Sequence, residues 1–120
     1  MPPAISLPPV ETFENQYPHR DYEIKISAPE FTSVCPKTGL PDFGEITVIY
    51  TPDRLVIELK AFKYYLLGFR TQGIFYENVV NRILDDLSQA IAPRAMTVIG
   101  DFSSRGGIRT RVEAIYKPGD

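Results

Sequence analysis

The segment FYENVVNRILDDLSQAI, residues 75–91, decides which fold this chain can adopt. Its apolar residues recur every three or four positions, which is the spacing of one face of an α-helix. That face consists of Val79, Val80, Ile83, Leu84, Leu87 and Ile91. Pro93 follows and ends the helix, because proline lacks the backbone N–H that a helix needs. The segment therefore predicts a long amphipathic helix whose apolar face must be covered by another element.

Segments on both sides of this helix alternate between apolar and polar residues, which is typical of strands with one face in water. The predicted strands are DYEIKIS (21–27), EITVIY (45–50), RLVIEL (54–59), TVIGDF (97–102) and IRTRVEAIY (108–116). The turn TPD, residues 51–53, is expected to join the second and third strands as a hairpin. SSRGG, residues 103–107, is expected to join the last two. Residues 28–44 are rich in turn formers and are predicted to be a loop.

A shorter helix is predicted from Lys60 onward, because KAFKYYLLGFR places Phe62, Leu66 and Phe69 on one stripe. The combined order predicts an α+β fold, in which two consecutive helices cover one face of an antiparallel sheet of about four strands. One domain is expected over residues 1–120, with residues 1–16 as an extended arm. An open sheet has two edges that can pair with another chain. A homo-oligomer is therefore expected, with a monomer whose edges carry charge as the alternative.

The composition argues against several classes of function. With 13 Lys and Arg against 15 Asp and Glu, the net charge of −2 does not suit a sequence-independent nucleic-acid binder. No apolar run approaches the roughly 18 residues of a membrane-spanning helix. A single cysteine cannot form an intramolecular disulfide, which suits a reducing cytoplasm. With only one histidine as well, no metal site is expected, and the absence of GxGxxG after a strand argues against a Rossmann cofactor site.

The only cysteine, Cys35, lies in FTSVCPKTGLPDF, residues 31–43, among turn-forming residues rather than in an apolar segment. A thiol in a loop beside Lys37 could have a lowered pKa and act as a nucleophile, or it could simply be a small residue. Asp42 follows seven positions later. A partly desolvated carboxyl group there could hold and donate a proton, although an aspartate before Phe43-Gly44 is also a common turn residue.

Further charged residues could bind a nucleotide-like ligand. Lys60 and Lys63 are three positions apart, hence on one helix face, and suit phosphate oxygens unless they form only a solvated surface. Arg105 in SSRGG could bind phosphate with its fork of N–H groups, or the two glycines there could serve only the turn. Glu58 and Glu77 could accept hydrogen bonds from the N–H edge of a guanine-like ring, although Glu77 also suits a helix N-terminus.

Four segments together resemble the single-domain nitrile reductases of queuosine biosynthesis, the QueF family of NADPH-dependent 7-cyano-7-deazaguanine reductases. They are FTSVCPKTGLPDF, ELKAFKYYLLGFR, GIFYENVVNRILDDL and SSRGGI, and the similarity runs in order from about Tyr17 to Tyr116. ELKAFKYY matches the family signature of Glu, then Ser or Leu, then Lys, a small residue, an apolar residue and Lys. The resemblance implies a tunnelling fold (T-fold), in which subunits join their antiparallel sheets into a barrel. It also implies active sites at subunit interfaces and a decamer of two pentameric rings.

The resemblance also implies the roles of individual residues. Cys35 would add to the nitrile carbon to give a covalent thioimide, with Asp42 as the proton donor, and two NADPH molecules would complete the reduction of nitrile to amine. The substrate-binding residues would be Ile57, Glu58, Leu59, Tyr76 and Glu77. The NADPH-binding residues would be Lys60, Lys63 and Arg105. Neither a nucleic acid nor a membrane would be a direct partner, and the enzyme would be cytoplasmic.

Two positions depart from the common family pattern. Many members carry His where this chain has Tyr76, and tyrosine cannot shuttle protons near neutral pH, so only a substrate contact is expected there. Leu59 replaces a common Ser and leaves the backbone N–H as the expected contact. The alternatives are an archaeosine-forming QueF-like amidine synthase that acts on tRNA without NADPH, and a non-catalytic T-fold scaffold that binds a purine. Zinc-dependent pterin-forming cyclohydrolases need His and Cys ligands that this chain lacks.

Overall fold

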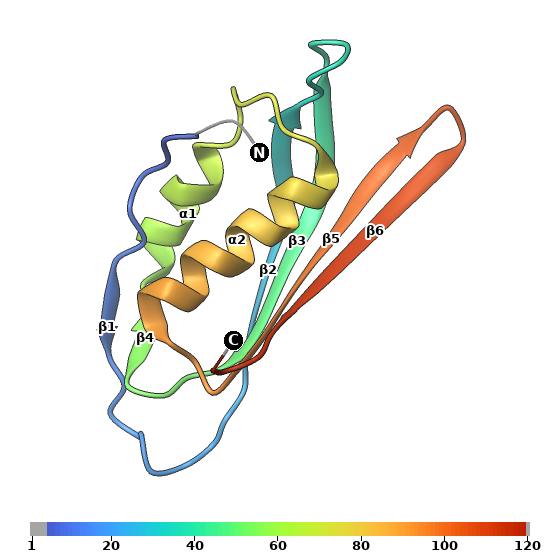
Figure 1. The fold of residues 1–120 in the computed structure, drawn as a ribbon. Helices are drawn as coiled ribbons and strands as arrows, with labels where there is room; N and C mark the ends of the chain where they lie inside the picture. The colour runs from blue at the N-terminus through green and yellow to red at the C-terminus, as the bar shows by residue number, and fades with distance from the viewer. Residues whose placement is uncertain (1–4, 120) are drawn as a thin grey trace.

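The computed structural model describes residues 5–119 (Figure 1). Its elements are β1 (Thr12–Glu14), β2 (Ile24–Val34), β3 (Pro41–Thr51), β4 (Leu55–Ile57), α1 (Leu59–Leu67), α2 (Tyr76–Ile91), β5 (Ala95–Arg105) and β6 (Ile108–Tyr116). Four strands form an antiparallel sheet in the order β2-β3-β5-β6, and both helices cover one of its faces. The predicted α+β fold is therefore confirmed. Residues 1–4 of the predicted arm lie outside the described residues.

The long helix is confirmed, and its apolar stripe forms the centre of the core. All six predicted residues of that stripe are buried. They pack with buried side chains of the sheet, among them Ile46, Val48 and Val98. α2 ends at Ala92, whose backbone is left-handed with φ 43°, directly before Pro93. Within the described residues no helix is long and apolar enough to span a bilayer.

The predicted hairpin between residues 45–50 and 54–59 is wrong. β3 pairs with β2 and β5, whereas β4 pairs with β1 from the N-terminal arm, with Thr12 opposite Ile57. Alternation shows that a segment is extended, but it does not specify the partner strand. The last two residues of the predicted strand, Glu58 and Leu59, belong instead to the start of α1.

The predicted loop over residues 28–44 is also wrong, because β2 continues to Val34 and β3 begins at Pro41. A register shift between Ala28 and Phe31 places two residues of β2 opposite one of β3, which is a β-bulge. Pro29 lies in this bulge. Proline is tolerated there because β2 is an edge strand, where a missing N–H costs little. Only residues 35–40 form the turn of this hairpin. Cys35 begins the turn, and Asp42 is the second residue of β3 after it.

The sheet divides at one end into two arms, which Figure 1 shows diverging above the start of α2. Pairing between β3 and β5 ends at Gly44 and Phe102. Beyond this pair, residues 31–44 form what we call the cysteine arm and residues 102–110 form the glycine arm. In the predicted loop at 103–107, β5 in fact continues to Arg105 through a second bulge, and only Gly106 and Gly107 turn the chain, with φ of 59° and 83°.

Candidate active site

Cys35 lies at the tip of β2 on the face that the helices cover. Side chains alternate along a strand, and the buried residues Ser33 and Phe31 are two and four positions before Cys35. The Cys35 N–H donates to the Leu40 carbonyl (2.9 Å), and the Gly39 N–H donates to the Cys35 carbonyl (2.9 Å). The Gly39 backbone is left-handed, with φ 72°. These bonds fix the thiol in a tight turn, half-buried and open to one side.

The pKa of Cys35 is lowered by hydrogen bonds from the Thr38 side chain and from the backbone N–H groups of Thr38 and Lys37. The sulfur therefore receives donors as a helix N-cap does, with Pro36 in the position that prolines favour. The sequence interpretation gave this role to Lys37, and its contribution comes from the backbone. Burial and the negative charge of Asp42 raise the pKa of Cys35 and so oppose these bonds. The Asp42 carboxyl group is therefore within electrostatic range of the thiol.

Replacing Thr38 by valine is expected to raise the pKa of Cys35, because the largest of the groups that lower it is lost. The thiolate fraction at a given pH then falls, and the pH dependence of alkylation by iodoacetamide moves toward higher pH. Thr38→Ser keeps the hydroxyl and serves as the control, since Thr38 Oγ1 also accepts from the Leu40 N–H (3.2 Å). Alkylation profiles of the valine variant and the wild type that superimpose would contradict this assignment.

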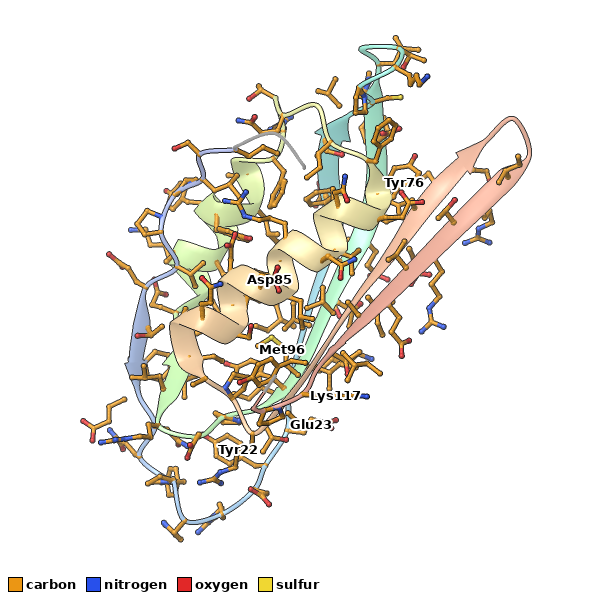
Figure 2. The ribbon with its side chains drawn as sticks, viewed as in Figure 1. Tyr22, Glu23, Tyr76, Asp85, Met96 and Lys117 are labelled. Carbon is orange, nitrogen blue, oxygen red and sulfur yellow. The ribbon has the colours of Figure 1, made fainter. Side chains whose placement is uncertain are left out.

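Asp42 is not a turn residue, because it lies within β3 and is only 5% exposed. The Tyr76 hydroxyl donates to Asp42 Oδ1 (2.9 Å). The Tyr76 ring stacks on Phe102, with centroids 4.0 Å apart and planes 12° apart. Figure 2 shows Tyr76 at the start of α2, where the two arms separate. Tyr76 therefore fixes the Asp42 carboxyl group in place, a role that the resemblance did not predict.

A cavity of about 250 Å³ lies between the two arms at this point. Asp42 and Tyr76 line it together with Leu40, Pro41, Phe43, Ser103 and Ser104. The bulge in β5 brings the two serines to this wall, since a bulge redirects side chains beside it. Glu77 follows Tyr76 in the first turn of α2 and is exposed. Cys35, Asp42, Tyr76 and Glu77 therefore belong to the same end of the molecule.

Ile57 and Glu58, two of the predicted substrate-binding residues, lie toward the opposite end of β3. The Ile57 N–H donates to the Tyr50 hydroxyl (3.1 Å), and Tyr50 is eight residues, about 26 Å, from Asp42 along the strand. Glu58 caps α1: its Oε2 accepts from the Lys60 N–H (2.7 Å) and its Oε1 from the Ala61 N–H (3.0 Å). One chain therefore does not bring Glu58 to Cys35.

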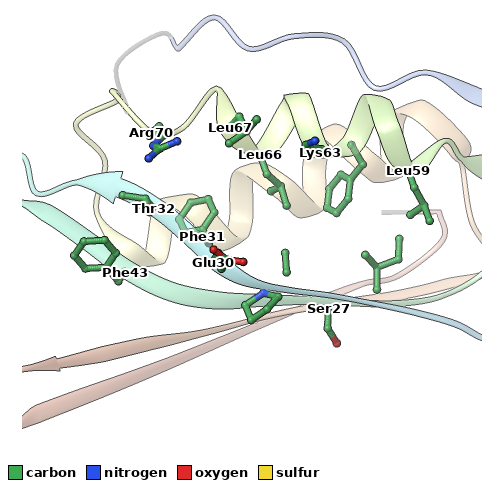
Figure 3. Close-up of a pocket in the computed structure, with 14 residues that line it drawn as sticks. Ser27, Glu30, Phe31, Thr32, Phe43, Leu59, Lys63, Leu66, Leu67 and Arg70 are labelled. Atoms are coloured by element: carbon green, nitrogen blue, oxygen red, sulfur yellow. The ribbon is translucent and has the colours of Figure 1, made fainter.

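A large groove runs between α1 and the edge strand β2 (Figure 3). Its volume is about 830 Å³ and its wall is mostly apolar, with Leu59 61% exposed. Lys63 and Arg70 also line this groove, whereas Lys60 is exposed one turn earlier on α1. The Arg105 backbone ends β5, but its side chain lies outside the part of the chain that the structure describes.

Comparison with known proteins places this arrangement in a family. The model of the QueF-like protein family matches residues 41–119. The chain belongs to the QueF-like protein family. A relative from Chloroherpeton thalassium, named NADPH-dependent 7-cyano-7-deazaguanine reductase, is 63% identical over 90% of this chain and 93% of its own. A relative of the same name from Chlorobaculum tepidum is also 63% identical, over 89% of this chain and 92% of its own.

A solved member of the QueF-like family has the same fold. The crystal structure of the archaeosine synthase QueF-Like in the apo form matches with a TM-score of 0.73 and 25% identity. The match covers 78% of this chain and 91% of that one. The chain thus has the T-fold expected from its sequence. Among QueF-like proteins, the reductases are far more similar to it in sequence than the solved archaeosine synthase is.

Proposed function

We propose that this chain reduces the nitrile of 7-cyano-7-deazaguanine to the aminomethyl group with NADPH, as a step in queuosine biosynthesis. The observation that carries the proposal is the 63% identity, over nearly the whole chain, to enzymes named for this activity. Cys35, and Asp42 within electrostatic range of it on the wall of the cavity between the arms, would supply the nucleophile and acid that such a reaction needs. The test is to mix free substrate with the enzyme. Two NADPH molecules should be consumed for each amine formed.

The first step is the addition of Cys35 to the nitrile. A C–S bond forms at the nitrile carbon as one π bond of the C≡N group breaks, and the nitrogen takes a proton. The lowered pKa of Cys35 increases the fraction of reactive thiolate. Asp42 supplies the proton, and the Tyr76 hydroxyl holds its carboxyl group in place. The product is a thioimide, which accepts a hydride more readily than a nitrile does.

The chain's own residues then protect and release the intermediate. NADPH, when bound, supplies the hydride for each of two reductions. Between them the C–S bond breaks, so that Cys35 is again a thiolate and the substrate is an imine. Water would hydrolyse an imine, so the intermediate must be kept from solvent. Asp42, the proposed proton donor beside it, is only 5% exposed.

The residues proposed to hold NADPH fit a bound nucleotide. Lys63 and Arg70 stand on the wall of a groove whose surface is otherwise largely apolar, which suits phosphates beside flat rings. Lys60 extends this positive surface by one helical turn. Arg105 would add a further cation from the glycine arm.

The deazaguanine is proposed to bind Glu58 and Glu77, with contacts from Ile57, Leu59 and Tyr76. The Glu58 carboxylate is fixed by two backbone N–H groups, and each oxygen retains a second lone pair. It is therefore already oriented to accept from the N–H edge of the ring. Ile57 is buried and positions the residue after it.

Because Ile57 is bonded to Tyr50, which is about 26 Å from Asp42 along β3, we propose that a complete site forms between two subunits. β2 and β6 are the outer strands of the sheet and offer edges for pairing. The proposed assembly is a homo-oligomer with the sheets joined into a barrel, as a decamer of two pentameric rings. We further propose a cytoplasmic location, with neither nucleic acid nor membrane as a direct partner.

Mixing two inactive variants tests the shared site. Cys35→Ala and Glu58→Gln are each expected to be inactive, and co-expression should restore activity to about one quarter of wild type, the share of interfaces in which both residues are intact. Mixing Cys35→Ala with Asp42→Asn is the matched control and should restore none, because those residues belong to the same chain's part of the site. Equal activity in the two mixtures would contradict a shared site.

The second candidate is amidine formation on tRNA, favoured by the structural match to an archaeosine synthase. It requires the same thiol and carboxyl group but neither NADPH nor a free base. An enzyme that leaves NADPH unoxidised with the free nitrile, yet modifies tRNA carrying it, would establish this alternative. A non-catalytic purine-binding scaffold would do neither.

A further inference from the structure

Ser33 carries a buried hydroxyl that has no role in the site as described above. Its side chain is 0% exposed, and its Oγ is the buried side-chain polar atom without a hydrogen-bond partner in the described part of the chain. A hydroxyl in this position has lost its bonds to water without replacement, and alanine would have avoided that loss. Such a group calls for a partner in some other state of the molecule.

The sheet register places Ser33 beside the proposed reacting groups. Ser33 is directly opposite Asp42 on the neighbouring strand, and both side chains are buried, so they share the helix-covered face. Cys35 is two residues further along the chain, directly after the end of β2, and the alternation of the strand places it on the same side. Ser33 is thus a direct neighbour of both the thiol and the carboxyl group.

The local backbone holds Ser33 firmly in this position. The Val34 N–H donates to the Gln72 carbonyl and the Ile74 N–H donates to the Val34 carbonyl, both at 3.0 Å. The segment between α1 and α2 therefore covers the free edge of β2 at this point, which excludes water from the hydroxyl. Rotation about one side-chain bond is the only adjustment that Ser33 needs to reach a new partner.

We propose that Ser33 is a positioning residue, whose hydroxyl donates a hydrogen bond to the Asp42 carboxylate formed when Asp42 gives up its proton. This inference rests on the proposed function. Tyr76 already donates to Oδ1 of the same group. A carboxylate is a stronger acceptor than a carboxylic acid, so the Ser33 bond strengthens as the proton leaves. The unpartnered hydroxyl is then a donor held ready for the charge that develops during the reaction.

The test compares Ser33→Ala with the wild type. Turnover is expected to fall about tenfold to a hundredfold, the effect of losing one hydrogen bond to a charged group. The melting temperature should stay the same or rise, because the variant removes an unpaired polar atom. The loss should fall on kcat and leave KM close to that of the wild type, because the Ser33 bond forms only as negative charge develops on Asp42.

Three controls separate this role from a structural one. Ser33→Thr keeps the hydroxyl and should recover most of the activity. Thr47→Val removes a buried hydroxyl from the opposite face of the sheet and should leave both kcat and KM unchanged. In an Asp42→Asn background, Ser33→Ala should have no further effect on thioimide formation. A wild-type kcat in Ser33→Ala would overturn the inference, whereas a wild type that does not reduce the nitrile would overturn the proposed function instead.

Discussion

Replacing Cys35 by alanine is expected to abolish both turnover and covalent capture of the substrate. The thiol is the only one in the chain and the proposed nucleophile, so turnover should fall by at least about a thousandfold. Intact-mass spectrometry with the nitrile and without NADPH provides the measurement. The wild type should gain the full mass of the substrate, because addition to a nitrile expels no leaving group. The variant should gain nothing.

Substrate binding separates loss of chemistry from loss of the site. Cys35→Ala should still bind the nitrile in equilibrium dialysis, since the proposed ring contacts lie on other residues and on the partner subunit. It should also unfold at the same urea concentration as the wild type, because the half-buried thiol contributes little to the core. A wild type that forms no adduct would refute the thioimide mechanism.

Replacing Phe102 by alanine is expected to destabilise the protein by about 3–5 kcal/mol, a large part of the stability of a typical domain. Phe102 is 2% exposed, and the last pair of the β3–β5 ladder joins it to Gly44. A Cβ at Gly44 would lie 2.8 Å from both the Phe102 ring and the Asp101 carbonyl, so the ring fills this space tightly. Urea unfolding at fixed protein concentration gives the measurement, because the proposed oligomerisation would also contribute to stability.

Two variants test whether this loss arises from packing at the fork of the sheet. Phe13 is 53% exposed, and Phe13→Ala removes the same atoms, so it should cost less than about 1 kcal/mol. Phe102→Leu keeps much of the volume and should fold, but it removes the ring on which Tyr76 stacks. A Phe102→Ala variant as stable as Phe13→Ala would show that the Phe102 ring is not part of the core.

The elements with a strong local pattern could be predicted from the sequence. The stripe on residues 75–91 specified a helix regardless of its surroundings, and residues 108–116 form a strand with the predicted bounds. Strand partners could not be predicted in this way, since pairing is a property of the folded chain. β4 therefore pairs with β1 of the arm instead of β3. The turn formers of residues 28–44 predict a loop, although a bulge in an edge strand accommodates one of them, Pro29.

The candidate site was predictable in its residue types but not in its contacts. The resemblance named Cys35 and Asp42, and the structure adds that Thr38 acts on the first and Tyr76 on the second. Ser33 was missed because the loop predicted over 28–44 concealed the alternation of Phe31, Ser33 and Cys35. Had the strand been continued through Pro29, this spacing would have placed all three on one face. The distance between Glu58 and Cys35 has no signal in a single sequence.

The two arms that enclose the cavity differ in mechanical stiffness. The cysteine arm is paired within its own hairpin and is also bonded along the edge of β2 to the segment 72–74. In the described part of the chain, the glycine arm beyond Phe102 is paired only within its own hairpin, across a turn of two glycines. Any widening of the cavity to admit a ligand therefore falls to the glycine arm. Ligand entry would then leave the turn around Cys35 in place.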